Sequence, residues 1–257
     1  MLLTGASGGI GRATVLRLAG GGARLALFAR REEPLRSLAK EVESAGGCAH
    51  VITGDVRRSA DASRAVTETT ERFGGLDALV NCAGVGYLRE VAEATDEEIL
   101  EQIDVNLTGV CRMTRAALPA LRVRQGSAIV NVASFAGRVG APYYSYYSAS
   151  KFGLVGLTEA WRRELRPLGI RVTLVVPAAV ETPFLDRVGR KRALGVGPAG
   201  TVLKPERVAR GVERALRRHP AELYLPWSNH WLAVLNVAAP ALSDRIVSAL
   251  FRYPGRR

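Results

Sequence analysis

The chain alternates between short runs of apolar residues and longer stretches in which apolar residues recur with helical spacing. Five apolar runs are separated by such stretches, at 23–29, 50–55, 77–84, 127–134 and 170–177. Short apolar runs of this kind predict buried strands, and the helical stretches between them predict crossover connections. The pattern therefore predicts an α/β fold, a doubly wound and mostly parallel sheet with helices on both faces.

Two local features refine this prediction. Only Met1 to Leu3 precede the turn at Thr4, so we expect an unusually short first strand. Thr95, followed three residues later by Glu98, forms a capping box, which predicts a helix start and places Asn106 inside a helix. No linker rich in proline or glycine divides the chain, so we expect one domain over residues 1–257.

The net charge of +12 raises the question of a nucleic-acid partner. The arginines are spread along the whole chain, although ten basic residues face four acidic ones from Lys204 onward. Attraction to anionic surfaces explains this excess as well as nucleic acid does. We therefore predict no nucleic-acid partner.

The cysteines, at positions 48, 82 and 111, have neither metal-ligand spacing nor the even count of a disulfide framework. We expect reduced thiols and no metal site. Nothing at the N-terminus resembles a signal peptide, and no run of eighteen apolar residues predicts a membrane-spanning helix. The expected location is the cytoplasm.

A glycine-rich turn follows the first strand, with Gly5, Gly8, Gly9 and Gly11 between that strand and an amphipathic helix. Glycine permits a tight turn and lets the backbone approach a pyrophosphate, whose charge the helix N-terminus favours. The spacing is G-x-x-x-G-x-G rather than the more common G-x-G-x-x-G. Its position in the first βα unit therefore carries the prediction of a dinucleotide site.

The end of the second strand predicts which dinucleotide binds. A free ribose 2′-hydroxyl usually meets an acidic residue about twenty positions after the glycines, whereas a 2′-phosphate needs a cation. Ala29 stands where the acid is expected, and Arg30 follows it with a planar fork of donors. We predict NADP(H) rather than NAD(H). The alternative is that Arg30 and Arg31 are solvated residues that lead into a helix.

The segment 142–151 holds four tyrosines, and spacing selects one of them. Lys151 lies four residues after Tyr147, so the two side chains share one face of a helix, whereas Tyr146 points elsewhere. An ammonium roughly 4 Å away favours the phenolate by on the order of 4 kcal/mol at an effective dielectric of about 20. We therefore expect Tyr147 to have a lowered pKa and to act as a general acid or base. Ser134, at the end of an apolar strand, would bring a hydroxyl to the same crevice.

These motifs, in this order, resemble the short-chain dehydrogenase/reductase family, whose fold is Rossmann-type, over at least residues 2–185. The match comprises TGASGGIG, GDV, NCAG, VNL, the serine and YSASK. The resemblance implies a catalytic tetrad of Asn106, Ser134, Tyr147 and Lys151. It implies that Tyr147 exchanges a proton with the substrate oxygen and that Ser134 hydrogen-bonds this oxygen. Lys151 would bind the nicotinamide ribose, and Asn106 would anchor a proton-relay water.

The resemblance also implies contacts with each part of the cofactor. Asp55 and Val56 would contact the adenine, Asn81 the adjoining backbone or ribose, and Val180 and Thr182 the nicotinamide carboxamide. The full set of expected cofactor contacts is Thr4, Gly5, Ser7, Gly9, Ile10, Gly11, Arg30, Asp55, Val56, Asn81, Ala83, Gly84, Tyr147, Lys151, Pro177, Val180 and Thr182.

The chain departs from the family pattern at Cys82, where asparagine is usual, and at Ala178, where glycine is usual. We interpret both as variation. The implied activity is an NADP(H)-dependent oxidoreductase acting on CH-OH (EC 1.1.1.-) that interconverts a ketone or aldehyde and an alcohol on a small apolar substrate. The alternatives are an isomerase or dehydratase on the same fold, a non-catalytic NADP-binding regulator, and a basic RNA- or DNA-associated protein. A dimer or tetramer is implied, through the helices that bear Asn106 and Tyr147.

Two C-terminal segments carry separate expectations. Residues 184–203 fall where the family keeps a substrate lid, and the basic triplet at 190–192 fits either an acidic substrate group or water. Residues 227–257 form an amphipathic basic tail, in which Trp227 and Trp231 precede an apolar run and arginines at 245, 252, 256 and 257. This pattern is typical of a helix in a membrane interface. It fits equally a segment that covers a subunit boundary or the substrate pocket.

Overall fold

The computed structural model of the chain describes residues 1–188 and 202–250. The described strands form one seven-stranded sheet in the order β3-β2-β1-β4-β5-β6-β7, with every neighbouring pair parallel. The strands are β1 (Leu2–Thr4), β2 (Arg24–Ala29), β3 (Cys48–Thr53), β4 (Ala78–Asn81), β5 (Ala128–Val132), β6 (Arg171–Pro177) and β7 (Glu222–Leu225). The order reverses between β1 and β4, so the predicted doubly wound sheet is confirmed. Ligands bind such sheets at the carboxyl ends of the strands beside this reversal.

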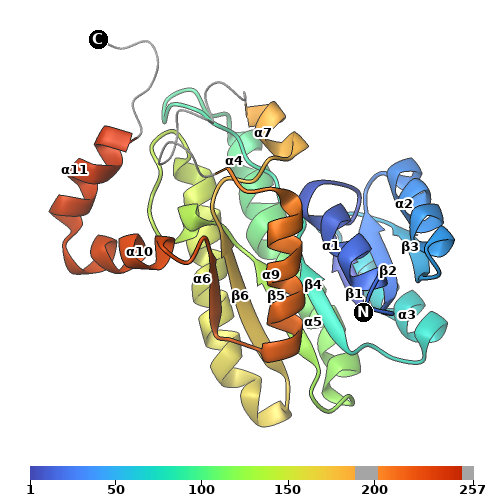
Figure 1. The fold of residues 1–257 in the computed structure, drawn as a ribbon. Coiled ribbons are helices and arrows are strands. Elements are labelled where there is room, and N and C mark those ends of the chain that lie inside the picture. Colours follow the sequence, from blue (N-terminus) through green and yellow to red (C-terminus); the bar gives the residue numbers. More distant parts are fainter. Residues whose placement is uncertain (189–201, 251–257) are drawn as a thin grey trace.

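Helices cover both faces of the sheet (Figure 1). One face is buried by α1, α2 and α9, through side chains such as Val15, Leu35 and Val208. The other is buried by α3, α5 and α6, through side chains such as Val66 and Met113. The helices before the last strand are α1 (Gly9–Ala19), α2 (Glu32–Ser44), α3 (Ser59–Phe73), α4 (Asp96–Ile103), α5 (Gly109–Arg122), α6 (Ser145–Glu164), α7 (Pro183–Val188) and α9 (Pro205–Arg218). Two short 3₁₀ turns lie at Phe135–Gly137 and Arg166–Leu168.

The two local predictions are confirmed. Strand β1 has three residues. The Thr95 hydroxyl accepts a hydrogen bond from the backbone N–H of Glu98 at 3.3 Å and caps α4. Asn106 lies in a π-helical turn, Asp104–Thr108, which joins α4 to α5. Such turns insert an extra residue and are frequent at functional sites.

The C-terminal tail forms two helices rather than one, α10 (Asn229–Ala238) and α11 (Pro240–Leu250). Pro240 cannot donate a backbone hydrogen bond to the preceding turn, so α10 ends before it. The two helices stand out from the body of the molecule on the side of α6 (Figure 1). Of the expected lid, 184–188 belong to α7 and Leu203 pairs with Val180. Residues 189–201, with the basic triplet, lie outside the described residues, as do 251–257.

Candidate active site

The glycine-rich turn brings the backbones of β1 and β4 into close approach. Gly5 has a φ of +70°, and a Cβ there would lie 2.8 Å from the Ala83 backbone. A Cβ at Gly11 would lie 2.1 Å from the Gly5 carbonyl oxygen. Thr4 completes the turn, because its hydroxyl accepts hydrogen bonds from the N–H groups of Cys82 at 3.1 Å and Ala83 at 3.2 Å. The turn therefore has room for glycine alone at positions 5 and 11.

A cleft of about 910 Å³ opens at the carboxyl ends of the strands, beside this turn. Fifteen of the expected cofactor contacts line it: Gly5, Ser7, Gly9, Ile10, Gly11, Arg30, Asp55, Val56, Ala83, Gly84, Tyr147, Lys151, Pro177, Val180 and Thr182. Thr4 and Asn81 do not. Thr4 supports the turn from behind. The Asn81 amide is buried and donates to Asn131 Oδ1 at 2.9 Å and Thr114 Oγ1 at 3.3 Å, so it braces the sheet interior.

The start of α1 offers a fit for a pyrophosphate. No side chain caps this helix at Gly8, and its first turn holds no acidic residue. The free N–H groups and the helix dipole therefore present partial positive charge to the cleft. Gly8 faces open space, since the nearest atom to a Cβ built there is Nη2 of Arg31, 3.9 Å away. This cradle suits the phosphates of a dinucleotide.

Arg30 lines the cleft beyond the end of β2, and Arg57 lies near it, since both contact Glu101. Arg30 is half-exposed, and its nearest acidic partner is Glu101, at 3.5 Å from Nη1. Arg57 contacts the same carboxylate at 3.8 Å and forms a two-nitrogen fork on Asp55 at 2.7 and 2.9 Å. Burial raises the pKa of Asp55, but the hydrogen bonds from Arg57 outweigh it and hold that pKa below its usual range. Because the Arg30–Glu101 pair is long and exposed, it is weak, and a phosphate would displace it readily.

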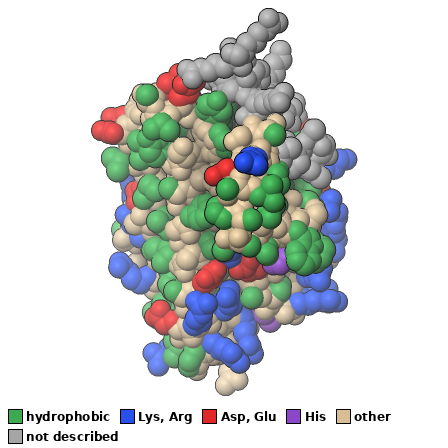
Figure 2. Space-filling view, turned by 90° about the vertical axis from the view of Figure 1, so that its left-hand side faces the viewer, with side chains coloured by type: hydrophobic (Ala, Val, Ile, Leu, Met, Phe, Trp, Pro, Cys, Tyr) green, Lys and Arg blue, Asp and Glu red, His purple; other side chains and the backbone are tan. Residues whose placement is uncertain are grey.

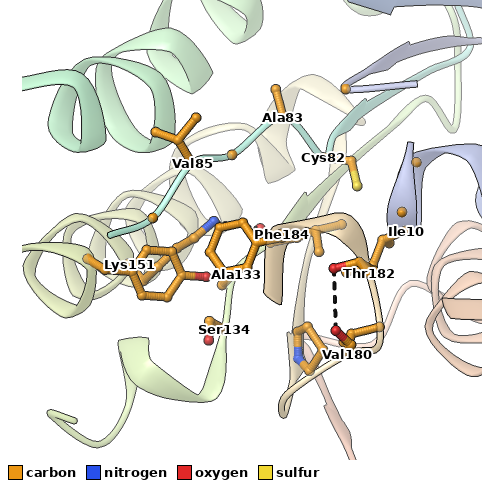
Figure 3. A pocket seen from close by; sticks show the side chains of 18 of the residues that line it. Ile10, Cys82, Ala83, Val85, Ala133, Ser134, Lys151, Val180, Thr182 and Phe184 are labelled. Carbon is orange, nitrogen blue, oxygen red and sulfur yellow. Dashed lines mark hydrogen bonds between the residues drawn. The ribbon is translucent and has the colours of Figure 1, made fainter. Parts of the chain in front are cut away.

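Ser134, Tyr147 and Lys151 meet in the middle of the cleft. Ser134 follows β5 and caps the next turn, where its hydroxyl accepts from the Ala136 N–H at 3.2 Å. Tyr147 and Lys151 come from the first two turns of α6, with the Lys151 ammonium 5.7 Å from the Tyr147 ring centre. Figure 3 shows Ser134 and Lys151 facing the same space, with Phe184 beside it. The spacing argument for Tyr147 is supported, because the hydroxyl of Tyr146 instead reaches the Val91 carbonyl at 3.3 Å.

The electrostatics differ from the expectation drawn from sequence. Burial raises the pKa of Tyr147 to about 12, although a hydrogen bond with Ser134 opposes the rise. Burial also lowers the pKa of Lys151 to about 8. The expected lowering of the Tyr147 pKa by Lys151 is therefore wrong for this structure. The reason is physical: a site that excludes water disfavours both the phenolate and the ammonium.

Asn106 is fully buried beside the cleft and does not line it. Its Oδ1 accepts from the Val85 N–H at 2.9 Å, and its Nδ2 donates to the Val85 carbonyl at 2.8 Å and to Ser150 Oγ at 3.0 Å. The extra residue of the π-helical turn aims the amide at this strand end. Asn106 thus fixes the backbone that follows β4, opposite α6.

The two departures from the family pattern are accommodated. Cys82 packs against the core at the cleft wall, and burial raises the pKa of its thiol to about 12. Among the described residues the non-glycine positions with positive φ are Tyr143 and His219, so Ala178 adopts ordinary backbone geometry. Neither position blocks the cleft.

Several cleft residues escaped the sequence analysis. Tyr144 is 8% exposed, with its ring centre 5.6 Å from that of Tyr147. Phe184 of α7 lies 5.7 Å from Tyr147 on the other side. From the C-terminal helices, Leu232 and Val247 reach the same space. The one sequence signal for Tyr144 was its position three residues before Tyr147, which puts the two side chains on one face of a helix. No local signal marks the α10 and α11 residues, whose position depends on tertiary packing.

The model of the family described as short chain dehydrogenase matches residues 1–193. The chain belongs to the short-chain dehydrogenase family. The chain is 43% identical over 189 residues to the monensin polyketide synthase putative ketoacyl reductase of Streptomyces virginiae, covering 73% of this chain and 72% of that protein. It is 36% identical over 211 residues to the 3-oxoacyl-(acyl-carrier-protein) reductase FabG of Thermotoga maritima, covering 81% and 86%.

Solved structures agree. The 3-ketoacyl-(acyl-carrier-protein) reductase of Brucella melitensis, complexed with NADH, superimposes with a TM-score of 0.79 at 31% identity, covering 87% of this chain and 94% of that one. The family model spans β1 to β6 and the helices between them, and the predicted family and fold are both confirmed.

Proposed function

We propose that the protein is an NADP(H)-dependent oxidoreductase that interconverts a ketone or aldehyde and an alcohol. One observation carries the proposal: Ser134, Tyr147 and Lys151 converge in a cleft that continues past the glycine turn to Arg30. The relatives are named as ketoacyl reductases, and the solved structure of one of them is described as a complex with NADH. Fold alone hosts many chemistries, but this set of side chains serves proton transfer to a carbonyl oxygen.

A bound NADPH would supply the hydride, and the chain's own groups would handle the substrate oxygen. Ser134 and Tyr147 donate hydrogen bonds that polarise the carbonyl, and the Tyr147 hydroxyl delivers the proton as the alcohol forms. Lys151 donates to the Val132 carbonyl at 3.2 Å, and its ammonium, 5.7 Å from the Tyr147 ring centre, would favour the phenolate when it is charged. Its lowered pKa, about 8, lets it give up and regain a proton near neutral pH. Asn106 positions the backbone at Val85 across the cleft.

The substrate end of the cleft favours an apolar ketone. Its walls beyond Tyr147 carry aliphatic and aromatic side chains with few charges: Phe135, Val139, Tyr144, Phe184, Leu185, Leu232 and Val247. A concave apolar site with a few polar groups at one end orients a substrate by its carbonyl. We therefore propose a ketone attached to an apolar chain. Its test is a series of ketones of rising chain length with NADPH, in which kcat/KM should rise with length.

The cofactor preference rests on Arg30. Replacing Arg30 by Asp should weaken NADPH binding by about tenfold to a hundredfold and leave NADH binding unchanged or improved, because a carboxylate repels a 2′-phosphate and accepts from a free 2′-hydroxyl. Fluorescence titration of both nucleotides measures the change. Arg36→Asp on the exposed side of α2 is the control, since Arg36 pairs with Glu32 outside the cleft. Equal affinity of the native protein for NADPH and NADH would contradict the assignment.

We further propose that the chain assembles as a dimer or tetramer through α5 and α6. Phe152 on α6 is 42% exposed, next to helix positions that serve the site. Light scattering should give twice or four times the chain mass, and Phe152→Glu should shift it toward the monomer because a buried unpaired charge is costly. A monomeric native protein would reject this assembly.

A further inference from the structure

An apolar surface covers the outward side of the C-terminal helices. Eleven large apolar side chains are exposed among the described residues, and five of them gather here: Trp227, Trp231, Val234, Val237 and Leu242. Trp227 and Trp231 are 65% and 60% exposed. Their rings pack edge to face, with 5.8 Å between the ring centres. Figure 2 looks onto this side and shows hydrophobic side chains gathered over it, with Lys and Arg side chains along its lower part. A cluster of this kind marks an interaction surface.

The surface lacks the charges that an exposed helix normally carries. From Leu223 to Ser243 the sequence contains no Asp, Glu, Lys or Arg. Helix α10 contacts the body through the buried Ala233 and through Asn236 on its inner side. Asn236 donates to the Arg138 carbonyl at 3.3 Å and accepts from the Ser243 hydroxyl at 2.8 Å, which ties α10 to α11. The apolar face of α10 is therefore the side that points away from the body.

Positive charge follows this surface in the sequence. After Asp244 the chain has no acidic residue, while Arg245, Arg252, Arg256 and Arg257 remain. The net charge of the whole chain is +12. Exposed tryptophans prefer the boundary between lipid headgroups and hydrocarbon, and basic residues beside them attract anionic lipids. No described helix is long and apolar enough to cross a bilayer.

We propose that the outer face of α10 and α11 docks on the surface of a bilayer that contains anionic lipids. The aromatic and aliphatic side chains enter the headgroup boundary, and the exposed Arg245 of α11 meets lipid phosphates. Two helices that project from the body can contact a bilayer without the close shape match that a protein partner requires. A second copy of the same face would bring two equally positive chain ends together, which opposes self-association.

The inner side of the same helices connects the docking surface to the cleft. Asn229, Leu232 and Val247 line the cleft that contains Tyr147. One element thus has its outer face toward the bilayer and its inner face on the apolar end of the cleft. A ketone dissolved in lipid would enter beside α10 without crossing water. This last step rests on the proposed function, whereas the docking does not.

The test compares two valines of equal exposure. Val237 near the end of α10 is 82% exposed, and Val123 directly after α5 is 80% exposed. The full chain, without cofactor or substrate, is pelleted with vesicles of phosphatidylcholine alone or with about a third phosphatidylglycerol. Native protein should bind the anionic vesicles. Val237→Glu should lower the partition coefficient by about tenfold or more, because a carboxylate enters the boundary poorly, and Val123→Glu should leave it unchanged.

Tryptophan emission provides an independent readout. Trp161 packs against the core, so a blue shift on adding anionic vesicles reports Trp227 and Trp231. High salt should weaken binding without abolishing the shift, since only part of the attraction is electrostatic. Failure to bind anionic vesicles, or equal loss in both glutamate variants, overturns the proposal. So does a concentration-dependent oligomer that Val237→Glu dissolves in the absence of vesicle binding, which would assign the face to a second copy. Because no turnover is measured, an inactive enzyme leaves the result interpretable.

Discussion

Replacing Tyr147 by Phe should lower kcat by about 10² to 10⁴ while NADPH affinity stays within about twofold of the native value. The ring keeps its contacts with Tyr144 and Phe184, at 5.6 and 5.7 Å between ring centres, so the cleft keeps its shape. Only the proton that passes to the substrate oxygen is lost. Single-turnover absorbance of NADPH with a saturating apolar ketone measures the rate, and fluorescence titration measures the affinity.

Tyr146→Phe is the matched control for this change. Its hydroxyl reaches the Val91 carbonyl outside the cleft, so its loss should leave kcat unaltered. A Tyr147→Phe variant that reduces the ketone at the native rate would refute the assignment of Tyr147 as the proton donor. A native protein that binds NADPH but turns over no carbonyl would favour a binding role for the fold instead.

The parts of the site that sequence predicted are those fixed by local geometry. Gly5 and Gly11 are required where two backbones nearly touch, and a pattern of glycines reports such a turn directly. Tyr147 and Lys151 share a face because α6 is regular over both positions. Strand boundaries followed from apolar runs because a parallel sheet is buried on both faces.

The expectations that differ from the structure depend on how deeply a side chain is buried and on which way it points, and local sequence does not determine either. Asn81 marks the end of β4, but the side to which an amide at a strand end turns depends on register, and here it turns inward to Asn131. The sign of the Tyr147 pKa shift was wrong because a Coulomb estimate from spacing cannot include the loss of water around the ring. The α10 contribution to the cleft depends on packing between segments far apart in the chain, such as Asn236 on Arg138, which are 98 residues apart.

The buried ammonium of Lys151 is expected to lower the free energy of unfolding of the chain. Burial lowers the pKa of Lys151 to about 8 in the folded chain, below the ordinary lysine value of 10.5. At Lys151 the unfolded chain therefore binds more protons between pH 8 and 10.5, so the contribution of Lys151 to the free energy of unfolding should rise with pH across that window, by about 3 kcal/mol. Cys82 opposes this rise from about pH 9, because burial raises the pKa of its thiol to about 12 and the unfolded chain releases that proton more readily. Below pH 8 the full cost is present. Above pH 10 the buried Tyr147, with its pKa raised to about 12, should reverse the trend, because unfolding releases its proton more readily.

Replacing Lys151 by Met should therefore stabilise the chain without cofactor by up to about 3 kcal/mol at pH 7 and remove the rise in stability that Lys151 contributes between pH 8 and 10, while abolishing turnover. Methionine preserves the length of the buried stem and removes the charge, leaving only the Val132 carbonyl without its 3.2 Å partner. Urea unfolding at stepped pH measures the change, with Lys40→Met on the exposed side of α2 as the control that should retain the native slope. A Lys151→Met chain that is less stable at pH 7, or whose stability changes with pH from 8 to 10 in the same way as that of the native chain, would show that the ammonium is well solvated. The lysine would then lack the strained, proton-releasing character on which the proposed chemistry depends. A side chain that weakens its own fold at the centre of a cleft is retained for what it does there, since selection for stability alone would replace it.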